Sequence, residues 1–137
     1  MFIPKVVRPL PNNKSQLKVN SQKDNDKVLI SGFYDTADAG FREDILWCLK
    51  KEGLRWDWLR CSDKETEENI AYINFLQTKD IIIIPSLNRK EDKVAFKEIS
   101  KHFPNYAANN CIFMADALPV WKYGGTFNCI SWTIKEK

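Results

Sequence analysis

Four consecutive isoleucines, Ile81 to Ile84, followed by Pro85, form the most hydrophobic stretch of the chain. β-branched side chains favour extended backbone, and an apolar run without alternation is typical of a strand that is buried on both faces. Such a strand requires other elements to cover both of its faces. The run therefore predicts an α/β protein in which further elements pack around this strand.

The segments around the isoleucine strand predict an ordered set of elements. These are Ala71 to Thr78 as a strand, Lys79 and Asp80 as a turn, Ile81 to Pro85 as a strand, Asp92 to His102 as a helix ended by Pro104, and Cys111 to Met114 as a strand. On the expected helix, Ala95, Ile99 and either His102 or Phe103 recur on the inward face.

A similar set is expected earlier in the chain. It comprises Val28 to Ile30 as a strand, Asp38 to Glu52 as a helix that Asp38 caps and Gly53 ends, and Trp56 to Arg60 as a strand. Corresponding positions of the two sets lie about 53 residues apart, just above the usual range for repeats. We therefore expect a repeat of architecture, in which neighbouring units pack together to bury their strands.

The length of 137 residues predicts a single domain. Within it, the pattern predicts an N-terminal arm or incoming strand over 1–14, a first ββαβ-like unit over 15–63, a second over 64–114, and the start of a third over 115–137. The third part is expected to hold a short helical turn to Trp121 and a strand over 127–134 that carries Cys129.

Composition excludes several classes of function. The net charge is only +3, and basic residues are interspersed with acids, so we expect no nucleic-acid partner. The chain has no run of about 18 apolar residues, so no membrane span is expected. The N-terminus lacks a signal-peptide core, and a cytoplasmic location is therefore expected. Four cysteines without CxxC spacing and one histidine indicate free thiols and predict neither a metal site nor a cofactor.

The segment Gly124-Gly125-Thr126-Phe127-Asn128-Cys129 is the strongest candidate for chemistry. A glycine pair allows unusual backbone angles and close approach of another group. Cys129 is then either a nucleophile or a structural thiol, and its spacing alone favours the structural role. His102, near the end of a lysine-rich helix, is either a stabilising cation there or a base for Cys129, and the first role is favoured.

Two further groups of residues have both a functional and a structural interpretation. Asp63, Glu65, Glu67 and Glu68 would bind a cationic substrate or form a solvated loop, and the loop is the default for such a run. Trp56, Trp58 and Trp121 would line a cation-binding pocket or pack in the core, and core packing is favoured for at least two of them.

Three stretches of the region 69–137 resemble the agmatine deiminase and peptidylarginine deiminase family, within the guanidino-modifying pentein superfamily. Tyr72-Ile73-Asn74-Phe75 followed by the run to Pro85 is similar to a strand pair of the family, and Phe103-Pro104 is similar to its helix end. The most specific match is Gly124-Gly125-x-x-x-Cys129, which resembles the segment that carries the family's nucleophile. Residues 24–63 resemble the preceding unit more loosely.

This resemblance implies a partial pentein-like arrangement of about two and a half ββαβ units, where the family has a propeller of five. It implies guanidino hydrolysis with Cys129 as nucleophile, and Gly124, Gly125 and Asn128 as substrate-binding residues. The substrate would be a guanidino small molecule or peptidyl-arginine.

The chain departs from the family in the partners of that cysteine. The family's H-x-D motif is absent from the matching stretch around Ser15, and Asn128 stands where agmatine deiminases often have histidine. Two functions therefore remain open: a deiminase-like hydrolase completed by a partner, and a non-catalytic binding or interaction protein. An incomplete propeller exposes strand edges, so a homo-oligomer or a second, completing chain is expected under both.

Overall fold

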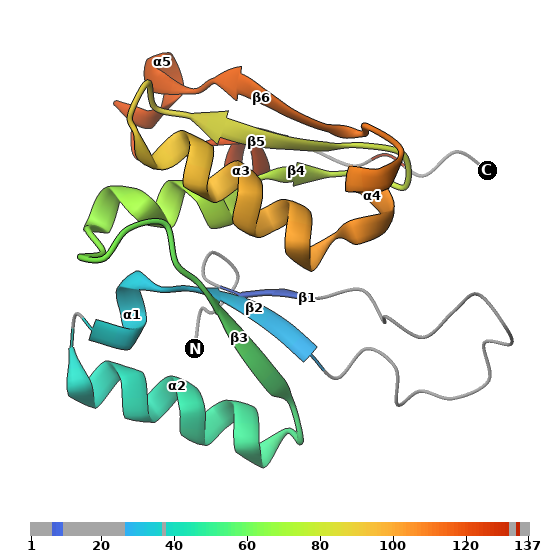
Figure 1. Ribbon diagram of the computed structural model, residues 1–137. Coiled ribbons are helices and arrows are strands. Elements are labelled where there is room, and N and C mark those ends of the chain that lie inside the picture. The colour runs from blue at the N-terminus through green and yellow to red at the C-terminus, as the bar shows by residue number, and fades with distance from the viewer. Residues whose placement is uncertain (1–6, 10–26, 37, 132–133, 135–137) are drawn as a thin grey trace, which may run out of the picture.

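The computed structural model describes residues 7–9, 27–36, 38–131 and 134 (Figure 1). These residues form two three-stranded sheets of the same design. Sheet A has the order β1 (Val7–Pro9), β2 (Lys27–Ser31) and β3 (Arg55–Leu59), and sheet B the order β4 (Leu76–Gln77), β5 (Ile82–Ser86) and β6 (Ile112–Asp116). In each sheet the first pair is antiparallel and the second pair parallel.

Helices connect the parallel strands of each sheet. In the first unit these are α1 (Phe33–Thr36) and α2 (Ala39–Lys51), and in the second α3 (Glu91–His102) and α4 (Pro104–Ala108). A 3₁₀ helix, η1 (Glu67–Asn74), precedes sheet B, and α5 (Leu118–Trp121) and α6 (Phe127–Ile130) follow it. None of the helices in the described residues is long and apolar enough to cross a membrane.

The predicted ββαβ repeat is confirmed. Asp38 caps α2 by accepting a hydrogen bond from the Phe41 N–H at 2.8 Å, and Gly53, with φ of +69°, follows the helix end. Val28 and Ile30, which face α2, correspond to Ile82 and Ile84, 54 positions later. β1 lies within the segment 1–14, which was expected to be an arm or an incoming strand, and it pairs with β2 of the first unit.

The second unit covers one face of sheet A, and α2 covers the other (Figure 1). On the α2 side, Val28 and Ile30 pack with Ile45, Leu46 and Leu49. On the other side, Leu29 and Leu59 belong to the main core. Their partners there include side chains of η1, α3 and sheet B, namely Tyr72, Ile73, Phe75, Ile82, Ile84, Ala95, Ile99, Phe103 and Ile112.

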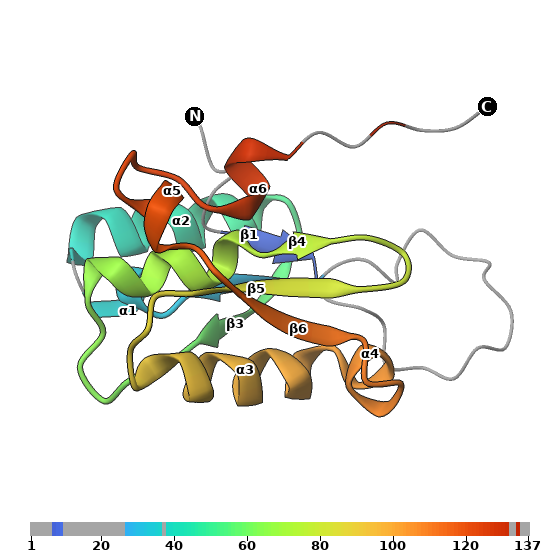
Figure 2. The same ribbon diagram turned by 90° about the horizontal axis from the view of Figure 1, so that it is seen from above.

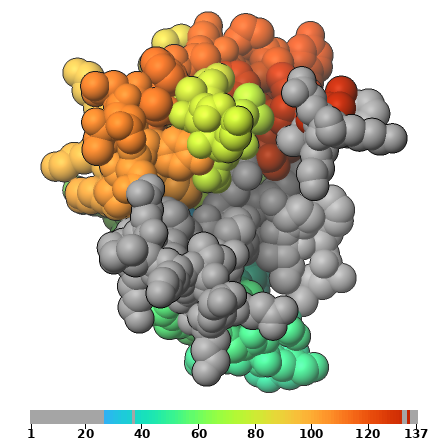
Figure 3. All heavy atoms as spheres, turned by 90° about the vertical axis from the view of Figure 1, so that its right-hand side faces the viewer, coloured from blue at the N-terminus to red at the C-terminus, as the bar shows by residue number. Residues whose placement is uncertain are grey.

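The strand predicted over 71–78 is wrong in its first part. Ala71 to Phe75 are all buried, and the backbone is a 3₁₀ helix up to Asn74, so that only Leu76 and Gln77 form a strand. A continuous apolar run fits a buried helix as well as a buried strand, since neither produces alternation. The turn that follows is confirmed: Thr78 to Asp80 lie exposed next to α4, where the Tyr106 hydroxyl donates to the Thr78 carbonyl at 2.7 Å (Figure 3).

Burial of the isoleucine strand on both faces is not seen in the described residues. Ile82 and Ile84 are fully buried against α3, whereas Ile83, which points to the other face, is only half-buried. The residue paired with Ile83 on β6 is Phe113, which is 49% exposed. Sheet B therefore has one packed face and one face with accessible apolar side chains.

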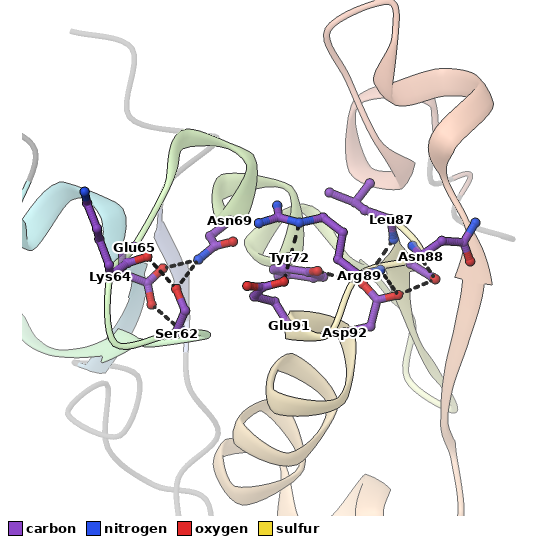
Figure 4. Close-up of polar contacts among 11 residues, drawn as sticks. Ser62, Lys64, Glu65, Asn69, Tyr72, Leu87, Asn88, Arg89, Glu91 and Asp92 are labelled. Carbon is purple, nitrogen blue, oxygen red and sulfur yellow. Dashed lines mark hydrogen bonds and ion pairs between the residues drawn. The ribbon is translucent and has the colours of Figure 1, made fainter.

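A buried carboxylate fixes the turn between β5 and α3. Asp92 accepts hydrogen bonds from the hydroxyls of Tyr72 and Ser86, each at 2.6 Å, and from the N–H groups of Leu87 at 3.1 Å and Arg89 at 3.4 Å (Figure 4). Burial acts to raise the pKa of Asp92, but these hydrogen bonds to the charged form outweigh it and lower the pKa below its ordinary value. The network attaches α3 to both η1 and β5.

Candidate functional site

Cys129 lies on a helix, so the strand predicted over 127–134 is wrong for its described part. Residues Phe127 to Ile130 form the short helix α6, and the Cys129 N–H donates to the Thr126 carbonyl at 3.0 Å. Phe127 packs on the small cluster of Ala71, Leu87 and Ala117. This packing outweighs the β-propensity of the segment. Trp132 and Thr133 lie outside the described residues.

The thiol of Cys129 is exposed and meets an amide from a distant part of the chain. Asn74, at the end of η1, donates from Nδ2 to the Cys129 Sγ at 3.1 Å. The position of Asn74 is fixed through its backbone. The backbone carbonyl of Asn74 accepts a hydrogen bond from the hydroxyl of the buried Thr126 at 3.1 Å. Asn74 is only 5% exposed, and its Oδ1 has no hydrogen-bond partner among the described residues.

Asn74 was not among the residues that sequence reasoning selected as a candidate site. It is the asparagine of the Tyr72-Ile73-Asn74-Phe75 stretch, which resembles part of a strand pair of the family. A buried polar residue in the middle of an otherwise apolar run was the available signal, because such a residue needs a specific partner.

The two glycines before α6 serve different purposes. Gly124 has φ of +84° and nothing within 4 Å of the position that a Cβ would take, so the backbone angle requires glycine there. At Gly125 a Cβ would lie 3.2 Å from the Cys129 Cβ and 3.8 Å from its Sγ. Gly125 therefore lies directly against the thiol. The half-buried Asn128 precedes Cys129 in the chain.

The remaining titratable candidates lie elsewhere. His102 is on α3, which packs on the opposite face of sheet B from α6 (Figures 1 and 2), and its Nδ1 lies 3.9 Å from the Asp57 carboxylate. Burial lowers the pKa of His102, although Asp57 acts in the opposite direction. The structure therefore brings no histidine to Cys129, and the lowered pKa of His102 disfavours the charged form in which it would act as a stabilising cation.

Of the four acidic residues predicted as a possible cation-binding group, Glu65 has a structural role. Glu65 accepts from the N–H group of Ser62 at 3.0 Å and from Asn69 Nδ2 at 2.7 Å (Figure 4). It also accepts from the Cys61 N–H at 2.6 Å. It closes the loop before η1, while Asp63, Glu67 and Glu68 are exposed. None of these four carboxylates has a hydrogen bond to Cys129 among the described contacts.

The three tryptophans pack against the core and do not form a common pocket. Trp56 and Trp58 contact the cluster under α2, and Trp121 contacts the cluster next to α6. The favoured core interpretation therefore describes all three. Only Trp121 lies in the same cluster as a residue of α6.

The four thiols differ in accessibility. Cys129 is exposed, Cys48 and Cys111 are half-buried, and Cys61 is buried. Burial, with the nearby Glu65, raises the pKa of Cys61, which leaves that thiol protonated and unreactive. In the described residues no group of three or more histidine, cysteine and acidic side chains is placed to hold a metal ion.

A cavity at the start of α3 does not have the candidate thiol in its lining. It has a volume of about 630 Å³ and is lined from the loop after β3 and the start of α3, including Arg60, Asp63, Lys90 and Glu91. Arg60 is already paired with Asp35. Cys129 is not among its lining residues.

The family model of the Porphyromonas-type peptidyl-arginine deiminases matches residues 10–134. This match covers nearly the whole chain. The chain belongs to that family. No curated protein matches the chain. The α/β fold with ββαβ units is accordingly a partial pentein-like arrangement.

Solved structures show the same fold. C. jejuni agmatine deiminase is 23% identical with a TM-score of 0.54, over 78% of this chain and 34% of that one. A cysteine-to-serine variant of that enzyme with substrate bound gives 22% and 0.54, over 77% and 32%, and the Enterococcus faecalis agmatine deiminase gives 22% and 0.56, over 77% and 36%. The chain thus spans about a third of the length of these structures.

Proposed function

We propose that this chain is the cysteine-bearing part of a guanidino-hydrolysing site, with Cys129 as nucleophile. The observation that carries the proposal is the exposed Cys129 sulfur, 3.1 Å from the amide nitrogen of the buried Asn74, in a chain of the deiminase family. The Asn74 side-chain N–H donates to the sulfur that would attack the substrate and fixes its position.

The chemistry follows from the electrophilic carbon of a guanidinium group. The Cys129 thiolate adds to that carbon, the C–N bond breaks, and the nitrogen leaves as ammonia after it gains a proton. Water then adds to the same carbon, the C–S bond breaks, and a ureido product leaves the regenerated thiolate. Both steps need a proton donor and acceptor, and carboxylates are needed to bind the cation.

The substrate is a guanidino compound, either a small molecule such as agmatine or a peptidyl-arginine. The substrate-bound variant of a C. jejuni agmatine deiminase supports this class. Gly125 leaves the approach to the thiol free of a side chain, and Gly124 and Asn128 border the same segment. We assign these three residues to substrate binding.

A second polypeptide supplies the base and the carboxylates. The single histidine of this chain lies on the far side of sheet B, and the described contacts of Cys129 include no carboxylate. Because a positioned general base contributes about 10²–10⁴ in rate, the isolated chain should be slow by at least that factor relative to a completed site.

The test is release of ammonia from agmatine and from an arginine-containing peptide. The purified chain should give slow release that the Cys129→Ala variant loses, while the matched Cys111→Ala variant keeps the wild-type rate. Equal release by the wild type and Cys129→Ala would overturn the proposal. Loss of release in Cys111→Ala as well would also count against it.

A further inference from the structure

The two sheets are covered differently on the faces that point away from their own helices. In sheet A this face packs against the second unit, where η1 contacts β2 and α3 contacts β3. Leu29 and Leu59 on it are 0% and 1% exposed. In sheet B, α6 contacts β5 on the corresponding face. Among the described residues no helix packs over β6 in the way that α3 packs over β3.

The uncovered part of sheet B is apolar. Ile83 and Phe113 are direct cross-strand partners, and Ala115 follows two residues later on the same face of β6. We call these three residues the β6 face. Phe113 is 49% exposed, Ala115 is exposed and Ile83 is half-buried, and none belongs to a buried cluster. The run of four isoleucines has the composition of a strand with both faces buried, which indicates a missing cover.

Helix α2, in turn, lacks the second sheet that packs against α3. It occupies the same place in the first unit as α3 in the second, between the parallel strands of its sheet. Whereas α3 packs against a second sheet, the main contacts of α2 in the described part of the chain are with α1 and with its own sheet (Figure 1). On α3, Ala95 belongs to the same buried cluster as Leu29 and Leu59 of sheet A, and the Nδ1 of His102 lies 3.9 Å from the Asp57 carboxylate. The equivalent residues of α2, 54 positions earlier, are Phe41 and Cys48. Phe41 is 43% exposed and Cys48 is half-buried.

We propose that the β6 face binds α2 of a second copy of this chain, as the corresponding face of sheet A binds α3 within one copy. The contact between sheet A and α3 within one copy is the model for this interaction. There the sheet of the first unit binds the helix of the second unit, and in the proposed contact the sheet of the second unit binds the helix of the first unit of another copy. The contact is heterologous, since it uses different surfaces on the two copies. It does not depend on the chemistry proposed for Cys129.

The oligomeric state of the purified full chain tests this directly, by sedimentation velocity over a range of concentrations. The wild type should associate, and both Phe113→Glu and Phe41→Glu should shift it to the monomer, because each places a charge in the apolar contact. Tyr123→Glu is the matched control. Its side chain is 91% exposed outside both surfaces, and it should associate like the wild type. Circular dichroism establishes that each variant is folded.

Mixing the two variants separates this arrangement from a symmetric one. Phe113→Glu keeps an intact α2 and Phe41→Glu keeps an intact β6 face, so an equimolar mixture should form heterodimers although each variant alone is monomeric. A wild type that is monomeric throughout, or a Phe113→Glu variant that still associates, would overturn the proposal. A Phe41→Glu variant that associates normally would exclude α2 as the occupant.

Discussion

Replacing Asp92 with asparagine tests the polar network that attaches α3 to η1 and β5. The substitution keeps the shape of the side chain and removes its charge. In the wild type, Oδ1 accepts from Tyr72 and the Leu87 N–H, and Oδ2 accepts from Ser86 and the Arg89 N–H. In the variant the amide oxygen keeps one of these two pairs of hydrogen bonds. The amide NH₂ faces the other pair, where the Ser86 hydroxyl can rotate to accept but the Arg89 N–H cannot.

The expected loss follows from these contacts. The two hydroxyl bonds at 2.6 Å have the length of charge-assisted bonds. Making each of them neutral costs about 1 kcal/mol, and the long contact to the Arg89 N–H adds a fraction of that. Asp92→Asn should therefore lower the free energy of unfolding by about 2–3 kcal/mol at pH 7.

The effect should depend on pH with a definite sign. Because the pKa of Asp92 is lowered in the folded chain, its stabilisation is fully present above the unfolded-state pKa, near 3.9, and is lost as the pH falls through the lower folded value. The difference between wild type and Asp92→Asn should thus be constant from pH 7 to about pH 5 and shrink in more acidic solution.

Urea unfolding followed by tryptophan fluorescence measures both quantities. The control is Asp44→Asn, an exposed position on α2, which should change stability by less than about 0.5 kcal/mol. A loss below about 0.5 kcal/mol in Asp92→Asn, or a loss that is the same at pH 7 and at pH 3, would refute the electrostatic reasoning.

Four further substitutions test local features by urea unfolding or hydrogen exchange. Gly124→Ala should cost about 1–2 kcal/mol because of its positive φ, and unchanged stability would contradict that argument. Ile84→Ala should cost about 2–5 kcal/mol and the half-buried Ile83→Ala clearly less, and equal losses would disprove one-sided burial of β5. Thr126→Val should speed exchange of the α6 amides by removing the hydrogen bond to the Asn74 carbonyl, and identical exchange would show that this bond does not hold the segment.

The sequence predicted those elements whose ends carry their own signals. Helix α2 has a capping aspartate and a glycine after its last turn, and β5 is a run of β-branched residues between turns, so local patterns suffice. The failures occur where burial is continuous or tertiary packing decides. Residues 71–75 are all buried and 71–74 belong to a 3₁₀ helix, and residues 127–130 are helical because Phe127 and Thr126 pack into the structure.

The candidate site was predictable only in part for a related reason. Gly124, Gly125 and Cys129 lie within six residues and are visible as one motif. The contact between Asn74 and Cys129 joins residues 55 positions apart, and no local pattern encodes such a pairing. A strand over 71–75, which the apolar run predicts, would not place Asn74 at the thiol, whereas the 3₁₀ helix that forms there does.

The reactivity of the four cysteines tests the role of Cys129 most directly. A haloacetamidine, which carries an amidinium next to an alkylating carbon, is added to the native chain, and labelling of each cysteine is followed over time by peptide mass spectrometry. Cys129 should react fastest, ahead of Cys48 and Cys111, with Cys61 last. Asn74→Leu should slow Cys129, while the matched Asn109→Leu should not. Labelling of Cys129 no faster than Cys48 and Cys111, or a rate unaffected by Asn74→Leu, would contradict the assignment of Cys129 as the nucleophile.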